Sequence, residues 1–283
     1  MRLSVCLDPA RPWADALALA QHAESVGLHG VWVCDHFLPY GGEGLPAAGP
    51  VLEGWTVLAA VAARTTRIRL GTLVLGASYR HPAVVAKMAA TLDQVSDGRL
   101  TLGLGAGWQP NEHTAYGIEL LPPAARLERF AEYVAAIRSL LRKPSTTVDG
   151  AWFRLTEATC DPPPVQRPLP LLVGGGGEQR TMRVAARHAE AWHTWATPAE
   201  LARKNAVLDQ RCAEVGRAPS AIARVTGDVL GPGEPADAVQ ARLAGYAGAG
   251  ADEFVLRDHR AQSLPEALRA VDRLVSAGQA APG

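Results

Sequence analysis

The sequence predicts an α/β protein in which residues 1–283 form a single (β/α)8 barrel domain, and three observations lead to this prediction. Short apolar runs of strand length alternate with Ala- and Leu-rich stretches of helical period, a pattern typical of a parallel sheet. The alternation repeats as eight strand–helix units, which in a chain of 283 residues favours a closed barrel over a doubly wound sheet. The strands are almost continuously apolar, as parallel strands covered on both faces should be.

The first half of the chain contributes four of these units. Pro12 suits a first helical turn, and Gly27 suits the left-handed position that ends a helix. A Gly- and Pro-rich loop follows the second strand as far as Pro50, and another loop is expected between the fourth strand and its helix. Strands are expected at 3–7, 30–34, 68–75 and 100–105, and helices at 12–26, 52–64, 82–95 and 124–141.

The alternation is interrupted at residues 145–170. Residues 146–155 are predicted to form a short hairpin that turns at Asp149-Gly150, and five prolines follow between Pro162 and Pro170. Because a proline run cannot pair inside a sheet, we interpret this region as a segment inserted into the barrel. The alternation then resumes, with strands expected at 171–173, 191–195, 222–229 and 251–256 and helices at 180–188, 198–215, 236–247 and 264–275.

Composition and charge exclude several classes of protein. The chain has 28 Lys and Arg residues against 28 Asp and Glu residues, so it lacks the basic excess of a nucleic-acid-binding surface. The longest clearly apolar helical stretch, residues 54–63, is too short to span a membrane, and the N-terminus lacks the apolar core of a signal peptide. We therefore expect a cytoplasmic protein that binds neither nucleic acid nor membranes.

Cysteine spacing and short motifs narrow the chemistry further. The four cysteines form no CxxC pair, as suits free thiols in a reducing cytosol: Cys6, Cys34, Cys160 and Cys212. Cys34 is either a reactive thiol or, as free thiols more often are, a packed core residue. The chain contains no HExxH motif or carboxylate cluster and no GxSxG motif, so the sequence predicts neither a metal site nor a serine hydrolase.

The four consecutive glycines Gly174–Gly177 are the most informative local feature. They lie between an expected strand and an expected helix, so their uncovered N–H groups and the positive end of the helix suit an anion such as a phosphate. The alternative is a tight strand–helix turn, which would explain one or two of these glycines, whereas four in a row favour a ligand. Arg180 either assists this site or lies on the surface.

The pair Asp35-His36, at the exit of the second strand, is the best candidate for acid–base chemistry. A histidine at a strand exit can titrate near neutrality, and a neighbouring carboxylate can orient it. Adjacent residues on a strand point to opposite sides, however, so a structural role is the open alternative. The fourth strand ends in the sequence GLGAG, residues 103–107, which lacks dinucleotide-motif spacing but leaves room for a flat ligand against the backbone.

These strand exits resemble the bacterial luciferase-like superfamily, and in particular its oxidoreductases that depend on the deazaflavin coenzyme F420. The resemblance extends from the first strand to the last helix, and FMN-using relatives share several of its blocks. The matching stretches are residues 33–37, 67–72 with His81-Pro82, 96–100, 103–108 with Glu112, and 174–177 with Ala191-Trp192.

The resemblance implies a TIM barrel enzyme that transfers a hydride between F420 and a small organic, apolar or aromatic substrate. In this reading His36 is the catalytic proton donor or orienting group, and the Leu73–Val74 peptide is a non-prolyl cis bond facing the deazaflavin ring. The implied cofactor-binding residues are Asp35, Leu73, Val74, Gly105, Ala106, Gly107, Asn111, Gly174, Gly175, Gly176, Gly177 and His193.

The chain departs from the sugar-phosphate dehydrogenases of this branch at two positions. Trp108 stands where those enzymes carry an acidic Glu, and Tyr40 stands where they carry a Trp. These aromatic residues, with Trp13 and Tyr79, suggest an apolar or aromatic substrate pocket rather than a sugar-phosphate site.

Two other functions stay open from the sequence. The first is an FMN-dependent monooxygenase that uses reduced flavin and oxygen, and oxygen uptake would separate it because reduced F420 is nearly unreactive with oxygen. The second is a non-catalytic barrel that binds a cofactor. Family resemblance also leads us to expect a homodimer and a partner enzyme that reduces the cofactor.

Overall fold

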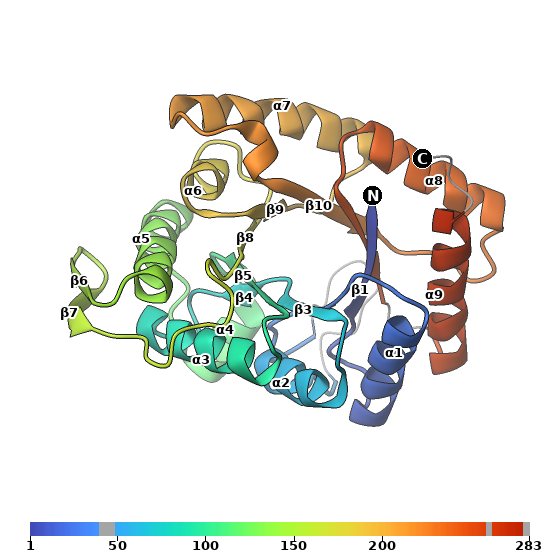
Figure 1. The fold of residues 1–283 in the computed structure, drawn as a ribbon, viewed down its shortest axis with the longest axis horizontal. Helices are drawn as coiled ribbons and strands as arrows, with labels where there is room; N and C mark the ends of the chain where they lie inside the picture. The colour runs from blue at the N-terminus through green and yellow to red at the C-terminus, as the bar shows by residue number, and fades with distance from the viewer. Residues whose placement is uncertain (40–48, 259–261, 280–283) are drawn as a thin grey trace.

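A closed ring of parallel strands forms the centre of the computed structural model, which describes residues 1–39, 49–258 and 262–279. Eight strands follow one another around the ring in the order β3-β2-β1-β11-β10-β9-β8-β5, and pairing of β5 with β3 closes it. The helices surround this ring on the outside (Figure 1). The (β/α)8 TIM barrel predicted from the sequence is therefore confirmed.

Each strand and helix expected from the sequence is present, with small shifts of its ends. The strands are β1 (Arg2–Leu7), β2 (Gly30–Val33), β3 (Arg69–Thr72), β4 (Leu75–Gly76), β5 (Leu100–Gly105), β6 (Thr146–Asp149), β7 (Arg154–Ala158), β8 (Leu171–Gly174), β9 (Ala191–His193), β10 (Ala223–Asp228) and β11 (Glu253–Arg257). The α-helices are α1 (Trp13–Ser25), α2 (Gly54–Arg64), α3 (Pro82–Val95), α4 (Pro110–Tyr116), α5 (Pro123–Arg142), α6 (Thr181–His188), α7 (Pro198–Glu214), α8 (Ala236–Gly248) and α9 (Leu264–Gln279).

The structure differs from the sequence prediction in two places. The expected third strand is interrupted at a non-prolyl cis bond, Leu73–Val74, and continues as the short β4, so one predicted strand becomes two. The region between β5 and α5, predicted to be a loop, contains the short helix α4. This helix begins with Pro110 and ends at Gly117, whose φ of 66° gives the left-handed conformation that terminates helices.

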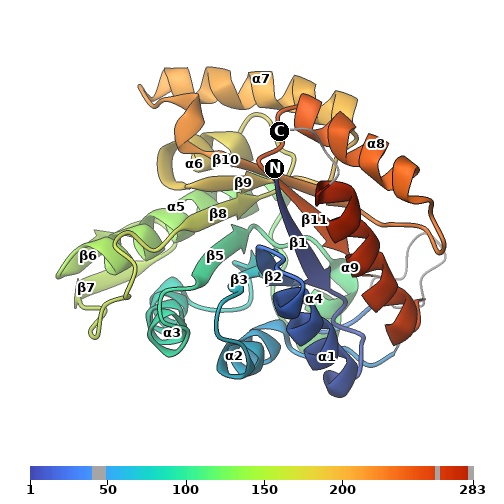
Figure 2. The ribbon, with the colours of Figure 1, turned by 45° about the vertical axis from the view of Figure 1, so that its right-hand side comes forward.

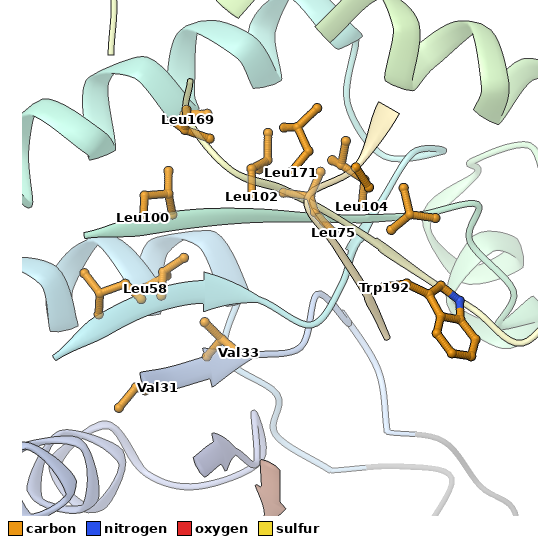
Figure 3. Packing of buried hydrophobic residues seen from close by; sticks show 14 of the residues in the cluster. Val31, Val33, Leu58, Leu75, Leu100, Leu102, Leu104, Leu169, Leu171 and Trp192 are labelled. Carbon is orange, nitrogen blue, oxygen red and sulfur yellow. The ribbon is translucent and has the colours of Figure 1, made fainter. Parts of the chain in front are cut away.

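Side chains of each barrel strand alternate between the helices and the interior of the ring. Leu100, Leu102 and Leu104 point the same way from β5 into the layer between strands and helices (Figure 3). The alternate residues Gly103 and Gly105 consequently face the interior. A smaller apolar cluster fills the lower interior: Cys6, Trp32, Leu73, Leu172, Ala191, Val225 and Val255.

The inserted segment projects from one side of the barrel as an antiparallel hairpin of β6 and β7, as Figure 2 shows. This confirms the predicted hairpin. Phe153 attaches the hairpin to the barrel, because its ring lies 5.8 Å from that of Tyr133 on α5 and 5.6 Å from that of His81. Within the described ranges, every helix is too short or too polar to cross a bilayer.

Candidate active site

The candidate active site lies at the carboxyl ends of the barrel strands, where parallel barrels collect functional side chains. His36 follows β2, Val74 separates β3 from β4, and His193 ends β9. The ring order brings these exits, far apart in the sequence, onto one rim.

A buried carboxylate, Glu112 of α4, holds His36 in place. The side chain of Glu112 is fully buried, and its Oε1 lies 2.9 Å from His36 Nδ1. Its Oε2 accepts the backbone N–H of Phe37 at 2.8 Å and that of Leu38 at 3.3 Å. The hydroxyl of Tyr79 also donates to Oε1. Glu112 thus fixes both the imidazole and the chain that follows it.

This pairing changes the acid–base properties of both groups. Burial alone disfavours a charged imidazole, but the hydrogen bond and charge of Glu112 outweigh it, so the pKa of His36 lies above its ordinary value. Burial likewise opposes ionisation of Glu112, yet the hydrogen bonds from His36 and Tyr79 hold its pKa below the usual range. The arrangement therefore favours a protonated imidazole beside an ionised carboxylate. His36 retains 26% side-chain exposure, so its second nitrogen can reach a ligand at the rim.

Asp35, for which the resemblance implies a cofactor contact, is bound by groups of the protein itself. Its carboxylate binds both terminal nitrogens of Arg80, at 2.8 and 3.0 Å, and accepts the N–H of Gly76 at 2.9 Å. Arg80 also pairs with Glu53, which caps the start of α2. Because these partners occupy the buried carboxylate, Asp35 fixes the position of β4 rather than facing an open site.

Val74, next to the cis bond, occupies a niche made by glycines of two other strands. A Cβ at Gly105 would lie 2.5 Å from Val74 Cγ2, and one at Gly174 would lie 2.6 Å from Cγ1. A Cβ at Gly103 would also meet Cγ1 at 3.3 Å. These glycines therefore make room for a protein side chain, and the cofactor contacts expected at Gly105 and Gly174 stay predictions.

The glycine loop divides into two functional halves. Gly174 belongs to β8, and the N–H of Gly175 donates to His193 O at 2.9 Å, so the first half serves the barrel. Gly175 also has a φ of 128°, which side chains rarely tolerate. The amides of Gly176 and Gly177 have no hydrogen-bond partner within the described part of the chain, and α6 begins just beyond them.

A cation borders this loop. Lys204 on α7 donates to Gly176 O at 2.8 Å and pairs with Glu178 at 3.2 Å. Arg180, the other cation considered from the sequence, instead pairs with Glu128 and donates to Ala124 O at 2.8 Å. The free amides, the start of α6 and Lys204 together suit a small anion, whereas Arg180 is bound to other groups.

His193 contributes a neutral polar group inside the barrel mouth. It is 4% exposed, and burial lowers its pKa to about 3, so the imidazole is uncharged. Its Nε2 is buried and has no hydrogen-bond partner among the described residues. Buried polar atoms are nearly always hydrogen-bonded, so this nitrogen is a candidate contact for a bound molecule.

The remaining predicted residues fall into different surroundings. Trp13 at the start of α1 and Trp108 after β5 are 37% and 49% exposed, and Trp108 packs edge-on against His36 with ring centroids 5.8 Å apart. Tyr79 is half-buried and bound to Glu112, so it belongs to the His36 network rather than to an apolar wall. The placements of the others are as follows: Ala106 and Gly107 follow β5, Asn111 lies on α4 and donates to Pro39 O, and Tyr40 lies outside the described residues.

Sequence reasoning did not assign roles to Glu112 and Arg80. Glu112 lies 76 positions from His36, and Arg80 lies 45 positions from Asp35. The available signal was local: Asn111-Glu112-His113 follows the fourth strand exit, and Arg80 follows the third. Two pockets of about 670 and 520 Å³ lie elsewhere, beside the proline-rich segment and between α2 and α3, so side-chain chemistry rather than cavity size locates the site.

A pair of thiols lies beneath this site. The sulfur atoms of Cys6 and Cys34 are 3.6 Å apart, and Cys34 Sγ lies 3.5 Å from Leu73 O. The hydrogen bond with Cys6 is the main cause that lowers the pKa of Cys34 to about 7, and the charges of His36 and Arg257 act in the same direction.

Cys34 is therefore expected to react with iodoacetamide before the other thiols, with a rate that rises as pH increases through about 7. The pKa of Cys6 is raised, as burial also raises those of Cys160 and Cys212, so these three hold less thiolate. Peptide mass spectrometry after short labelling measures the order. Faster labelling of Cys160 or Cys212 would contradict this expectation, and Cys34→Ser provides the blank.

The chain is similar in sequence to several curated enzymes. F420-dependent glucose-6-phosphate dehydrogenase of Amycolatopsis mediterranei is 38% identical over 164 residues, which is 58% of this chain and 48% of that protein. Phthiodiolone/phenolphthiodiolone dimycocerosates ketoreductase of Mycobacterium sp. (strain JLS) is 33% identical over 233 residues, 75% of this chain and 60% of that one. The chain thus spans about half to three fifths of these relatives.

Solved structures share the fold along almost the whole chain. An F420-dependent secondary alcohol dehydrogenase in complex with an F420-acetone adduct matches with a TM-score of 0.84 at 20% identity, covering 98% of each chain. Monooxygenase RslO1 from Streptomyces bottropensis matches with a TM-score of 0.82 at 22% identity and the same coverage. The family model for luciferase-like monooxygenases matches residues 1–281, and this chain belongs to that family.

Proposed function

We propose that the protein is an F420-dependent oxidoreductase that transfers a hydride between the deazaflavin and a small organic substrate. One observation carries this proposal: two features lie on the same rim of the barrel. The first is the imidazole of His36, held by buried Glu112, and the second is a loop whose amides at Gly176 and Gly177 are unpaired within the described chain. The F420 enzymes among its relatives support the cofactor. FMN, with oxygen as co-substrate, is the alternative cofactor.

The residues present fit such a cofactor. A phosphate would bind at the amides of Gly176 and Gly177 beside Lys204, without needing a net positive charge on the protein. The buried, unpaired Nε2 of His193 would meet a polar group of the cofactor, and Val74 would support its ring. When bound, F420 supplies the hydride chemistry, and the protein supplies orientation and a surface that excludes water.

His36 manages the proton in this proposal. Its Nδ1 is committed to Glu112, so Nε2 is the atom that donates a proton to the substrate or orients it. The raised pKa of His36 keeps this proton in place to a higher pH than on a free imidazole. Oxidation of an alcohol would use the same atoms in the reverse direction.

Titration of the purified protein with F420 and with FMN, followed by fluorescence, tests the cofactor. Tight binding of F420 and no oxygen uptake with the reduced cofactor is the expected result. Preferential binding of FMN with oxygen consumption would replace the proposal by a monooxygenase. Tight binding of a reduced cofactor that no acceptor reoxidises would indicate a non-catalytic binding protein.

Gly176→Asp is expected to weaken F420 binding by at least about tenfold, or about 1.4 kcal/mol. The new carboxylate would repel the phosphate and pair with Lys204, whose Nζ would lie 3.3 Å from the added Cβ. Gly176→Ala is the matched control: it adds the same Cβ without charge, at a residue whose φ is not positive. Equal F420 affinity in the Asp and Ala variants would show that the phosphate does not bind at this loop.

A further inference from the structure

Arg257, the last residue of β11, carries a charge that the proposed chemistry does not use. Its side chain is exposed, and the guanidinium has neither a hydrogen bond nor an ion pair within the described ranges. The neighbouring carboxylate of Asp258 is already bound to Arg11. Strand alternation places Arg257 on the same face as Val255, which lies in the cluster inside the barrel.

An aromatic ring fixes the direction of this side chain. The guanidinium carbon of Arg257 lies 5.7 Å from the ring centroid of Trp195, a cation–π contact. The intervening strand carries Gly227, where a Cβ would lie only 3.0 Å from the ring of Trp195. Trp195 in turn packs edge-on against His193, with centroids 4.6 Å apart. Trp195 therefore holds the side chain of Arg257 at the mouth of the barrel. The N–H groups along the edge of the guanidinium stay available to a ligand.

The strand order β2-β1-β11 places Arg257 on the same part of the rim as His36. After the hydrogen bond from Cys6, the charges of His36 and Arg257 are the groups that lower the pKa of Cys34. Arg257 stands in register with Cys6 of β1, whose sulfur lies 3.6 Å from Cys34 Sγ, and His36 follows Cys34 by two residues at the exit of β2. Asp8, the residue after β1, acts in the opposite direction on the pKa of Cys34.

We propose, on the basis of the function proposed above, that Arg257 is a substrate-binding residue and that the substrate carries an oxyanion, a carboxylate or a phosphate. The stacked guanidinium presents parallel N–H groups that match such an anion in a bidentate manner. The reducible part of the substrate then lies toward His36 and the exposed Trp108. Trp195 is a positioning residue, because its ring holds the guanidinium of Arg257 in place at the open end of the barrel.

Calorimetric titration with benzoate, phenyl phosphate and benzamide tests this site, with the protein alone and with F420 present. Benzoate or phenyl phosphate should bind at least about tenfold more tightly than the neutral benzamide, and the preferred anion identifies the class. Arg257→Gln should reduce the ratio to about one, and Arg257→Lys should retain part of it. Arg154→Gln, on the hairpin and 83% exposed, is the control that should keep the full ratio.

Two results would overturn the proposal. One is equal binding of all three probes to the unsubstituted protein. The other is a loss of F420 affinity in Arg257→Gln with an unchanged probe ratio, because this would place the guanidinium on an anionic part of the cofactor. Failure of F420 to bind the unsubstituted protein would instead contradict the proposed function, and the titrations without F420 would still report on Arg257.

Discussion

Replacing His36 by alanine is expected to lower kcat by about 10²- to 10⁴-fold with any acceptor that the unsubstituted enzyme reduces. The loss follows from the geometry, because Glu112 commits Nδ1 and leaves Nε2 to donate the proton. Affinity for F420 should be retained, since the proposed phosphate contacts lie at Gly176 and Gly177. Steady-state kinetics and a fluorescence titration measure the two effects separately.

The pH profile gives a second readout of the same role. A proton donor must be protonated, so kcat should fall as pH rises through the pKa of His36, which lies above the ordinary value of about 6.5. His22→Ala is the matched control, because His22 pairs with Asp272 on the outer surface. Full turnover in His36→Ala, or an unchanged profile, would remove His36 from the chemistry.

Glu112→Ala is expected to lower the free energy of unfolding by about 3–5 kcal/mol, the cost of removing one partner from a buried charged pair. The substitution leaves His36 without its counter-charge and the partly buried N–H groups of Phe37 and Leu38 without an acceptor. Urea unfolding measures the change. Glu119→Ala, on an exposed position of the same region, should leave stability nearly unchanged.

Glu112→Gln separates the charge of this residue from its shape. The raised pKa of His36 means that its stabilising pair is complete below the unfolded pKa, about 6.5, and is lost as pH rises through the folded value. Glutamine should remove this pH dependence and lower the pKa of His36, so the kcat profile should move to lower pH. A profile that does not move would show that Glu112 has only a structural role.

The barrel could be predicted because its signals are local. Apolar runs, helical period and cap residues specify each strand and helix within about twenty positions. The strand break at Leu73–Val74 occurs at a cis bond that periodicity cannot reveal, and the structure confirms the cis bond that the family resemblance implied. The hairpin at Asp149-Gly150 was equally visible, since turn residues stand between two short runs of extended type. Helix α4 was missed because it is short.

The candidate site was predictable only in its parts. His36 and the glycine loop stand out individually, but their partners come from distant positions: Glu112 reaches His36 only because α4 lies across the exit of β2. The packing of Gly105 and Gly174 could not be read from the sequence, since their common neighbour, Val74, lies between β3 and β4 and is distant from both glycines along the chain. Such assignments depend on which residues of neighbouring strands lie side by side. The sequence predicts that the barrel closes, but it does not predict this register.

The niche around Val74 has a consequence for how this barrel can be altered. Residues 74, 105 and 174 share one volume, so a larger residue at either glycine is compatible only with a smaller one at 74. A single larger residue at either glycine should destabilise the fold, whereas the same change paired with a smaller residue at position 74 should be tolerated. Redesign of this niche therefore couples β5, β8 and the junction of β3 with β4, and shortening Val74 creates space without a compensating change at either glycine.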